Sequence, residues 1–288
     1  MEPLVHLNGA VVAAADARIP VMDRGFLFAD AAYEGLGVLD GQIVDFEHHM
    51  ARLERSLDEL SISAGRERDE WWHLLMALVT GNSVEEGFLY LHITRGVGST
   101  RAYVPDDDLT PTVFAFVQCY DGPRVDDPAP VLTLATASDL RWARRDIKTP
   151  NLLGQVLAKR HAQEQGCDEA LLVTPEGMVT ECGSRSFFIV SGGEIVTRPT
   201  SNDILSGVTR RAVIAVAAEL DLAVEERIVS LDEALAADEA FATAASTYVQ
   251  PVVSIDGEPV GDGAAGVVAL QIRSEHIRAV RASFYSPG

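Results

Sequence analysis

Residues Asp146–Gly154 read DIKTPNLLG and form the most informative stretch of the chain, because they include one of only two lysines among 288 residues. The other is Lys159, so arginine supplies nearly all of the positive charge. Pro150 forces the residue before it into an extended conformation, and Asn151 can cap a following helix. Lys148 therefore lies at a strand-to-helix junction. A lysine placed there beside apolar residues can act as a Schiff-base nucleophile, and the alternative is an ordinary loop lysine.

A second informative stretch is LSGVTR, Leu205–Arg210, at the start of a predicted helix. A helix N-terminus offers unpaired N–H groups and the positive end of the helix dipole, Gly207 allows close approach, and Thr209 adds a hydroxyl. The stretch could hold one phosphate group. The alternative is that Ser206 or Thr209 only caps the helix.

The third stretch is MVTECGSRSF, where Glu181 interrupts the apolar strands of a hairpin. A carboxylate at a half-buried strand end needs a cationic or hydrogen-bond-donating partner. Glu181 could therefore hold a protonated pyridinium nitrogen. It could equally form a structural pair with one of the many arginines.

Several functional classes find no support in the sequence. The chain holds no H-E-x-x-H, G-x-S-x-G or G-x-x-x-x-G-K-[ST] motif, so we predict no metal site, serine hydrolase or nucleotide triphosphate site. We also predict no Rossmann dinucleotide site, although Gly261–Gly266, GDGAAG, match the spacing of its glycines. With 23 basic against 43 acidic residues the net charge is −20, which disfavours nucleic acid and anionic membranes as partners.

The cysteines and the apolar runs predict a soluble, cytoplasmic protein. The three cysteines, Cys119, Cys167 and Cys182, are odd in number and show no C-x-x-C spacing, which is compatible with a reducing compartment. The N-terminus carries no basic leader, and no apolar run approaches the ~20 residues of a membrane span.

Length and composition predict two packed domains with full cores, since 47 % of the residues are hydrophobic. Residues 119–130, CYDGPRVDDPAP, hold three prolines and can form neither a helix nor a central strand. We therefore predict a small α+β domain over 1–118, a linker over 119–130 and a large domain over 131–288.

Hydrophobic periodicity predicts a mixed α/β chain. The predicted helices cover 45–60, 69–79, 152–165, 208–220, 231–236 and 264–283. The predicted strands cover 5–7, 35–39, 43–45, 88–94, 113–117, 131–135 and 239–243, together with the hairpins ALLV-TPEG-MVTE and SFFIV-SGG-EIVT. The helix over 152–165 carries an apolar face of Leu152, Leu153, Val156 and Leu157, and Lys159 on its flank is interpreted as a solvated side chain.

An ordered set of short motifs runs along nearly the whole chain. It comprises Asp23-Arg24-Gly25, Phe28-Ala29-Asp30, Tyr33-Glu34-Gly35, His49-Met50-Ala51-Arg52-Leu53, Thr94-Arg95-Gly96, Asp146-Ile147-Lys148, Asn151-Leu152-Leu153-Gly154, Val179-Thr180-Glu181 and Gly207-Val208-Thr209-Arg210. The set resembles the fold type IV pyridoxal-phosphate enzymes, and within that group the D-amino-acid transaminases most. The resemblance implies a two-domain α+β or mixed α/β transferase with its active site between the domains.

The resemblance also implies a role for each site residue, with pyridoxal 5′-phosphate (PLP) as the cofactor. Lys148 would form the internal aldimine and carry the proton between Cα and C4′, while Glu181 would keep the pyridine nitrogen protonated. The other implied cofactor-binding residues are Arg52, Val208 and Thr209 at the phosphate, the backbone of Ala245, and Leu205 on the ring face. The implied substrate-binding residues are Tyr33, Gly35, Ser246, Arg101 and Tyr103, the last two reaching in from a partner subunit.

The implied reaction is a ping-pong transamination between a D-amino acid of the D-alanine or D-glutamate type and a 2-keto acid, in a homodimer with shared active sites. Four positions depart from the pattern: Tyr103 replaces a histidine, Gly35 a bulkier residue, Ser184-Arg185-Ser186 a Ser-Ser-Asn run, and Ala245 a threonine. A pocket widened at Gly35 and Gly37 could admit (R)-amines. An (R)-amine or branched-chain aminotransferase, an aminodeoxychorismate lyase and an idle small-molecule-binding protein remain alternatives, and the partner of Arg185 is open.

Overall fold

The computed structural model describes residues 2–120 and 125–287, and it divides the chain into two compact units. Unit 1 comprises Met1–Gly122, Ile147–Asn151 and Ser283–Gly288, and unit 2 comprises Pro123–Asp146 and Leu152–Ala282. The short segment that holds Lys148 therefore belongs with the N-terminal part of the chain, although residues on both sides of it belong to unit 2.

Each predicted domain is one continuous range of the chain, whereas each unit combines separate segments. Ile147–Asn151 and Ser283–Gly288 lie inside the C-terminal domain of the sequence-based division but are assigned to unit 1 by contacts. Residues 121–124 of the predicted linker lie outside the described residues. The predicted boundaries at 118 and 131 therefore stay predictions.

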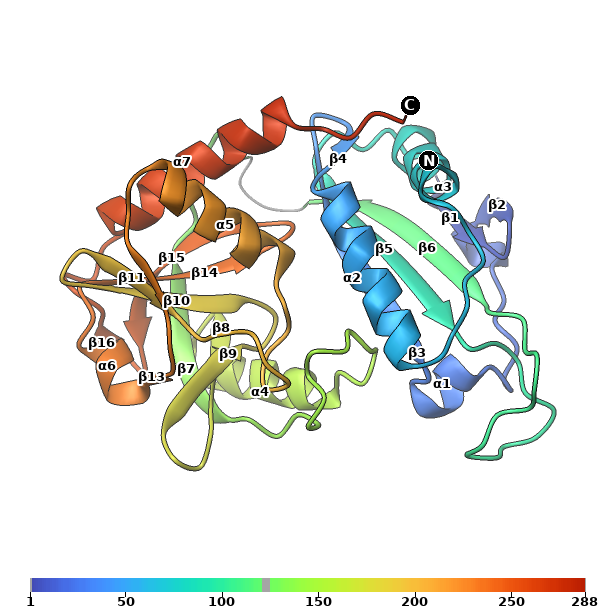
Figure 1. Cartoon of the computed structure of the whole chain (residues 1–288), viewed down its shortest axis with the longest axis horizontal. Helices are drawn as coiled ribbons and strands as arrows, with labels where there is room; N and C mark the ends of the chain where they lie inside the picture. The colour runs from blue at the N-terminus through green and yellow to red at the C-terminus, as the bar shows by residue number, and fades with distance from the viewer. Residues whose placement is uncertain (1, 121–124, 288) are drawn as a thin grey trace. The chain divides into compact units, whose positions relative to one another are not determined.

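Unit 1 is built on one sheet of six antiparallel strands in the order β2-β1-β6-β5-β3-β4. The strands are β1 Leu4–Leu7, β2 Ala10–Ala13, β3 Ala31–Leu39, β4 Gln42–Ile43, β5 Gly87–Thr94 and β6 Val113–Cys119. Helices α2 (Phe46–Glu59) and α3 (Arg68–Gly81) cover one face of this sheet, and α2 packs against β3 (Figure 1). Leu36, Leu89 and Leu91 are fully buried in the core of this unit.

Two short helices precede β3, η1 (Ala14–Asp16) and α1 (Arg24–Phe28). Asp23 caps α1, since its Oδ1 accepts a 2.8 Å hydrogen bond from the Gly25 N–H. Ala29 ends α1 in the left-handed conformation with φ of 56°. The sequence analysis missed α1 because five residues are too few to show a helical period.

Unit 2 contains a sheet of ten strands in the order β12-β11-β10-β14-β15-β7-β8-β9-β13, with β16 pairing β15. The strands are β7 Leu132–Ser138, β8 Glu169–Val173, β9 Met178–Cys182, β10 Ser186–Ser191, β11 Glu194–Thr197, β12 Val224–Glu226, β13 Val229–Ser230, β14 Glu239–Ala244, β15 Tyr248–Ile255 and β16 Glu258–Pro259. One apolar cluster joins residues of β7, β8, β9, β10, β14 and β15, so these strands curve around a common core. β15, which holds a proline, was absent from the predicted strands.

The helices of unit 2 are α4 (Leu153–Glu164), α5 (Val208–Glu219), α6 (Leu231–Leu235) and α7 (Val267–Ala282). α5 and α7 pack on each other and on the sheet around the stacked rings of Phe188 and Phe241, whose centroids lie 4.7 Å apart (Figure 1). This packing fixes the N-terminal end of α5, which is part of the candidate site.

Helix α4 differs from its prediction in two ways. It buries Ala158 and Ala162, whereas the expected core face of Leu153, Val156 and Leu157 is 67 %, 57 % and 50 % exposed. The helix begins at Leu153 with Leu152 as the N-cap, so the predicted cap by Asn151 is wrong.

Across residues 2–120 and 125–287, no helix has the length and apolar character needed to cross a bilayer. The three cysteines are free thiols. The same residues contain no cluster of three or more His, Cys, Asp or Glu side chains suited to a metal ion.

Candidate active site

Lys148 lies in the segment Ile147–Asn151 beside the edge of β3 that β4 leaves unpaired. The Tyr33 N–H donates a 3.0 Å hydrogen bond to the Lys148 carbonyl, and the Lys148 N–H donates to Ser56 Oγ of α2 at 3.3 Å. The Lys148 Nζ lies 4.3 Å from the centroid of the Tyr33 ring. The backbone of Lys148 is thus held by a strand and a helix, and its amine is brought to Tyr33, a predicted substrate residue.

Arg52 is fixed on α2 by the buried carboxylate of Glu34. Arg52 Nε donates to Glu34 Oε1 at 2.8 Å and Nη2 to Oε2 at 2.7 Å, while His49 Nδ1 lies 2.8 Å from Oε2. Burial by itself would raise the pKa of Glu34, but Arg52 and His49 hold that pKa well below its usual range. Burial lowers the pKa of His49, although the Glu34 carboxylate opposes this.

This arrangement fixes Arg52 in one orientation on the helix that also binds Lys148. Arg52 and Ser56 are four residues apart on α2, so both lie on the same side of the helix. The bidentate contact with Glu34 uses two of the five N–H donors of the guanidinium. Glu34 and His49, which position Arg52, were not among the predicted site residues. The sequence shows them only as an acid beside Tyr33 and a histidine three residues before Arg52.

Arg101 and Tyr103 lie together on an exposed loop of unit 1. Tyr103 is 81 % exposed, and the Arg101 guanidinium lies 5.0 Å from the Phe28 ring centroid and 5.8 Å from that of Tyr103. Among the residues that the structure describes, neither side chain hydrogen-bonds to Tyr33 or stacks on it. One chain therefore does not assemble the three predicted carboxylate-binding groups.

The Phe88 ring packs against the backbone of Gly35. A Cβ at Gly35 would lie 2.6 Å from Cε2 and 2.7 Å from Cζ of Phe88. The Phe88 ring thus occupies the space that a larger residue at position 35 would take. The pocket widened at Gly35 and Gly37 for amine substrates stays a prediction.

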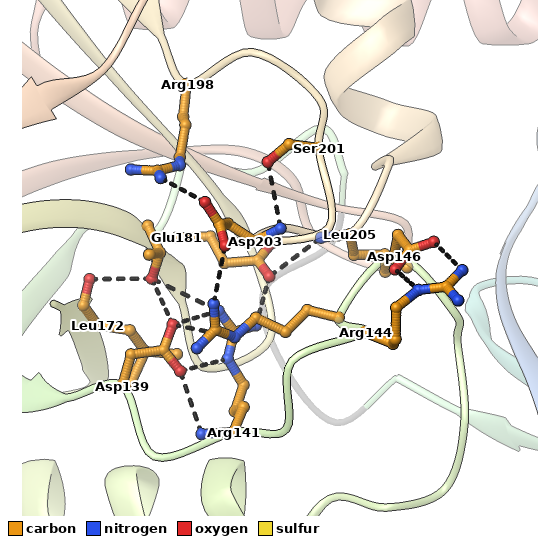
Figure 2. Close-up of polar contacts among 12 residues, drawn as sticks. Asp139, Arg141, Arg144, Asp146, Leu172, Glu181, Arg198, Ser201, Asp203 and Leu205 are labelled. Atoms are coloured by element: carbon orange, nitrogen blue, oxygen red, sulfur yellow. Dashed lines mark hydrogen bonds and ion pairs between the residues drawn. The ribbon is translucent and has the colours of Figure 1, made fainter.

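In unit 2, Glu181 lies at the centre of a buried polar network (Figure 2). Arg141 Nη1 donates to Glu181 Oε1, and the Leu205 N–H donates to the same oxygen at 3.2 Å. Burial raises the pKa of Glu181, and the Arg141 guanidinium opposes this rise. The structural pair with an arginine that the sequence left open is present, and Arg141 is the partner.

Asp139 holds the Arg141 guanidinium in place from the other side (Figure 2). Arg141 Nε donates to Asp139 Oδ1 at 2.9 Å and Nη2 to Oδ2 at 2.8 Å, while the Thr180 hydroxyl donates to Oδ2 at 2.8 Å. Burial alone would lower the pKa of Arg141, but Asp139 and Glu181 raise it. Arg141 therefore stays charged and fixes the orientation of Glu181.

The N-terminus of α5 is close to this network through Leu205. Gly207, which has no side chain, is the N-cap of α5. The alternative that Ser206 or Thr209 serves only as a cap stays a prediction. Val208 and Thr209 are buried in the first turn. A Cβ at Gly207 would lie 2.6 Å from Ser186 Oγ, which shows how closely the helix start approaches β10.

The turn between β14 and β15 contains Ala245 and Ser246. Arg273 Nη1 of α7 holds the turn by donating to the Thr247 carbonyl at 2.9 Å. Tyr248 adopts φ of 59°, a conformation that costs free energy for a residue other than glycine. The buried Thr247 Oγ1 has no hydrogen-bond partner among the described residues, so the turn carries an unsatisfied hydroxyl.

Arg185 finds its partners within unit 2. Its Nη1 donates to Glu169 Oε2, and its Nε donates to Gln250 Oε1 at 3.1 Å. The side chain of Glu169 is 2 % exposed and also accepts from the Ser184 hydroxyl at 2.9 Å. Arg185 therefore neutralises a buried acid at the start of β8. Lys159, on α4, lies 3.8 Å from the same carboxylate.

Two groups of predicted residues are thus assembled, one in each unit. Unit 1 brings together Lys148, Tyr33 and, through α2, Arg52. Unit 2 brings together Glu181, Leu205 and the first turn of α5. The 245–247 turn follows β14, and Thr243 of β14 pairs with Ser186 of β10, the residue that the start of α5 approaches.

Comparison with known proteins identifies the family. The family model described as amino-transferase class IV matches residues 31–255. The chain belongs to the class IV aminotransferases. This aminotransferase is 35 % identical over 269 residues to a D-alanine aminotransferase of Staphylococcus haemolyticus, covering 93 % of this chain and 95 % of that protein. It is 36 % identical over 270 residues to a D-alanine aminotransferase of Bacillus licheniformis, covering 94 % of each.

Solved structures show the same fold type IV architecture for this aminotransferase. A T.th. branched-chain amino acid aminotransferase with pyridoxamine 5′-phosphate aligns at a TM-score of 0.90 and 26 % identity, covering 98 % of this chain and 95 % of that one. The PLP form of the branched-chain enzyme of Thermobaculum terrenum aligns at 0.86 and 27 % identity, covering 98 % and 94 %. The cofactor of the present chain is accordingly PLP.

The donor set of the chain fits this cofactor. Lys148 supplies an amine for the aldehyde, and the buried acid Glu181 matches a ring nitrogen that carries a proton. The uncapped start of α5 offers N–H groups to a phosphate, and Thr247 Oγ1 is a buried hydroxyl that still lacks a partner among the described residues.

We predict that Glu34→Gln lowers the free energy of unfolding by about 3 to 5 kcal/mol at pH 7, because Arg52 loses its buried counter-charge. The folded pKa of Glu34 lies below the unfolded value of ~4.3. Its stabilising effect is therefore fully present above pH ~4.3 and is lost as the pH falls through the folded pKa. The difference between wild type and variant, measured by urea unfolding, should shrink at acidic pH.

The matched control is Glu54→Gln on the same helix. The Glu54 side chain is 55 % exposed and pairs with Arg68 at the surface, so its loss should cost less than about 1 kcal/mol. Equal stabilities of the two variants at pH 7 would contradict the role of Glu34.

Proposed function

We propose that this aminotransferase moves the amino group of a D-amino acid, of the D-alanine or D-glutamate type, to a 2-keto acid in a ping-pong cycle. Lys148 carries the proposal, because it is one of two lysines in the chain and the one whose backbone is fixed at β3 and α2. The identity of 35 % to 36 % with D-alanine aminotransferases supports the substrate class.

Bound PLP supplies an electron sink for the negative charge that develops when the substrate Cα loses its proton. In this proposal the Lys148 amine holds the cofactor between turnovers, and Nζ carries the proton between the substrate Cα and C4′. The position of Nζ over the Tyr33 ring, 4.3 Å from its centroid, limits the directions from which Nζ can approach. Lys159 is not assigned this role, because its amine contacts the Glu169 carboxylate and the Asp168 carbonyl.

Glu181 keeps a proton on the cofactor ring nitrogen in this proposal. Two hydrogen bonds to its carboxylate, from Arg141 and from the Leu205 N–H, both go to Oε1, and we assign Oε2 to the ring nitrogen. Arg141 prevents the carboxylate from rotating, because Asp139 in turn holds two of the guanidinium nitrogens. A charge held in a fixed position in this way stabilises the transition state without reorganisation.

The phosphate is assigned to the first turn of α5 and to Arg52. Val208 and Thr209 present N–H groups at the positive end of the helix dipole, and the Thr209 hydroxyl adds a donor. Arg52 contributes its positive charge, which Glu34 holds in one orientation. We place the backbone of Ala245 at the phosphate, Leu205 against the ring face, and Ser246, Gly35 and Tyr33 beside the substrate.

We further propose a homodimer in which Arg101 and Tyr103 of one subunit serve the site of the other. Both residues are exposed and lie apart from Tyr33 in a single chain. A second copy is also the partner that we assign to the exposed apolar face of α4, which carries Leu153, Val156 and Leu157. Large apolar residues gathered on one surface are typical of an interface between subunits.

We assign the reaction to the cytoplasm. The three cysteines are all free thiols, which suits a reducing compartment.

Leu157→Arg on α4 should convert the dimer to a monomer, because it places an unpaired charge in the proposed apolar interface. Light scattering after size-exclusion chromatography should give about 31 kDa for the variant and about twice that mass for the wild type. Val267→Arg, at a residue that is 76 % exposed on α7, is the control and should leave the mass of the wild type unchanged. A dimeric Leu157→Arg protein would exclude the α4 face as the interface.

Arg101→Ala should separate amino-acid substrates from amine substrates. A guanidinium binds a carboxylate through two parallel hydrogen bonds, so the variant should lose at least about tenfold in kcat/KM for D-alanine, or ~1.4 kcal/mol. The kcat/KM for (R)-1-phenylethylamine, which carries no anion, should not fall. Arg18→Ala, at an exposed arginine of unit 1, is the control.

An unchanged ratio of the two kcat/KM values after Arg101→Ala would remove Arg101 as the carboxylate anchor. L-Leucine is the third donor in this comparison, because the structural neighbours include branched-chain aminotransferases. A wild-type enzyme that prefers L-leucine to D-alanine would overturn the D-amino-acid assignment.

A further inference from the structure

Two backbone N–H groups hold the loop that carries Arg101 and Tyr103, one through a side chain of the loop and one through the Met22 carbonyl. The Ser99 N–H donates to Asp106 Oδ2 at 2.8 Å, and the Gly98 N–H donates to the Met22 carbonyl at 3.2 Å. Residues 101–104 lie between these contacts, and their side chains are exposed. Solvent-exposed side chains do not hold a loop in one conformation, so the fixed geometry must come from the backbone.

Arg24 supplies two hydrogen bonds to that part of the backbone. Its Nη1 donates to the Ala102 carbonyl at 2.7 Å and its Nη2 to the Tyr103 carbonyl at 2.9 Å. These carbonyls belong to the two peptide groups on either side of the Tyr103 side chain. Arg24 is only 4 % exposed although its two acceptors lie in an exposed loop.

Asp30 accepts a third hydrogen bond from the Arg24 guanidinium. Arg24 Nε donates to Asp30 Oδ2 at 2.8 Å, and Arg95 Nε donates to the same oxygen at 2.8 Å. Burial would raise the pKa of Asp30, but Arg95 and Arg24 hold it below its ordinary value. Arg95 Nη1 also donates to the Ser61 carbonyl at 3.0 Å, beyond the end of α2. The loop is thus tied through Arg24, Asp30 and Arg95 to the helix that carries Arg52.

The Phe28 ring lies against both Arg24 and Arg101. The Arg24 guanidinium lies 4.8 Å from the centroid of the Phe28 ring, and the Arg101 guanidinium lies 5.0 Å from it. The Tyr103 ring centroid lies 5.8 Å from that of Phe28. Phe28 therefore contacts the residue that holds the loop and both residues that the loop presents.

We propose that Arg24 is a positioning residue for recognition of the substrate carboxylate. It orders the 101–103 backbone so that the Arg101 guanidinium and the Tyr103 hydroxyl are presented together. The inference rests on the proposed function, in which Arg101 binds the carboxylate. Arg24 itself does not touch substrate in this role, and its loss weakens the binding of carboxylate substrates only.

Lysine cannot replace Arg24 in this role. A planar guanidinium donates in three fixed directions, here to Asp30 and to two carbonyls, whereas an ammonium is a point charge on a flexible stem. Arg24→Lys therefore keeps the charge and much of the volume but loses the geometry. Misplacement of a binding group by about 1 Å can reduce the rate by up to about 10²-fold, so a measurable effect on D-alanine is expected.

The test compares the wild-type holoenzyme with Arg24→Lys by two measurements. Hydrogen exchange should become faster at the amides of residues 98–106 and stay unchanged in unit 2. The KM for D-alanine should rise about tenfold with kcat changed less than about twofold, while the KM for (R)-1-phenylethylamine should not change. Arg18→Lys, whose guanidinium bonds to nearby carbonyls at the surface, is the matched control and should behave as wild type in both measurements.

Asp30→Asn is the second variant, which tests the same idea should Arg24→Lys fail to fold. It keeps an oxygen acceptor for Arg24 but removes the charge, so both effects should appear in the same direction and be smaller. Wild-type exchange at 98–106, or faster exchange with an unchanged KM for D-alanine, would overturn the positioning role. Failure of the proposed function gives a different result. Arg101→Ala then leaves the ratio of kcat/KM for D-alanine to kcat/KM for (R)-1-phenylethylamine unchanged, while Arg24→Lys still speeds hydrogen exchange at residues 98–106.

Discussion

The hydrogen bond from the Tyr33 N–H to the Lys148 carbonyl places the Lys148 amine, which we propose as the reactive amine of this enzyme. It joins β3 to a five-residue segment that is more than a hundred residues away in sequence. The edge of β3 is open at this point because β4 pairs only with Val38 and Leu39. The backbone of Lys148 is therefore held as an added edge contact of the sheet, and the amine projects from a fixed base rather than from a flexible loop.

Buried carboxylates of the chain are held by arginines, and this recurs at each part of the candidate site. Glu34 holds Arg52, Arg141 holds Glu181, and Asp30 orients Arg24. Arginine suits these positions because its planar group binds a carboxylate through two hydrogen bonds and keeps its charge when buried. A chain that uses arginine for structural charge leaves its few lysines for other purposes. That explains why the position of Lys148 is informative even before the fold is known.

The sequence predicts the local features of this protein well. Lys148, Glu181 and the start of α5 are recognisable because each breaks a local pattern: an amine before a proline, an acid within an apolar hairpin, and a glycine at a helix start. The periodic elements α2, α3, α5 and the two hairpins lie close to their predicted bounds. These features depend on neighbours within a few residues, which is the range over which periodicity and capping act.

The features that sequence reasoning missed depend on contacts across long separations. The pairing of Arg141 with Glu181, the placement of Ile147–Asn151 in unit 1 and the Phe88 ring over Gly35 join residues that are 40 or more positions apart. The sequence predicts a buried apolar face on α4, but the structure leaves that face exposed. Helical periodicity does not show whether an apolar face packs on the core of its own chain or on another molecule.

Chemical mapping of the lysine that binds the cofactor tests the central claim most directly. The holoenzyme, purified with PLP, is reduced with sodium borohydride so that the cofactor becomes covalently fixed to the amine that holds it, and the digested protein is analysed by mass spectrometry. The account predicts modification of the peptide that contains Lys148 and an unmodified Lys159. Modification of Lys159, or of neither lysine in a protein that has bound PLP, would contradict it.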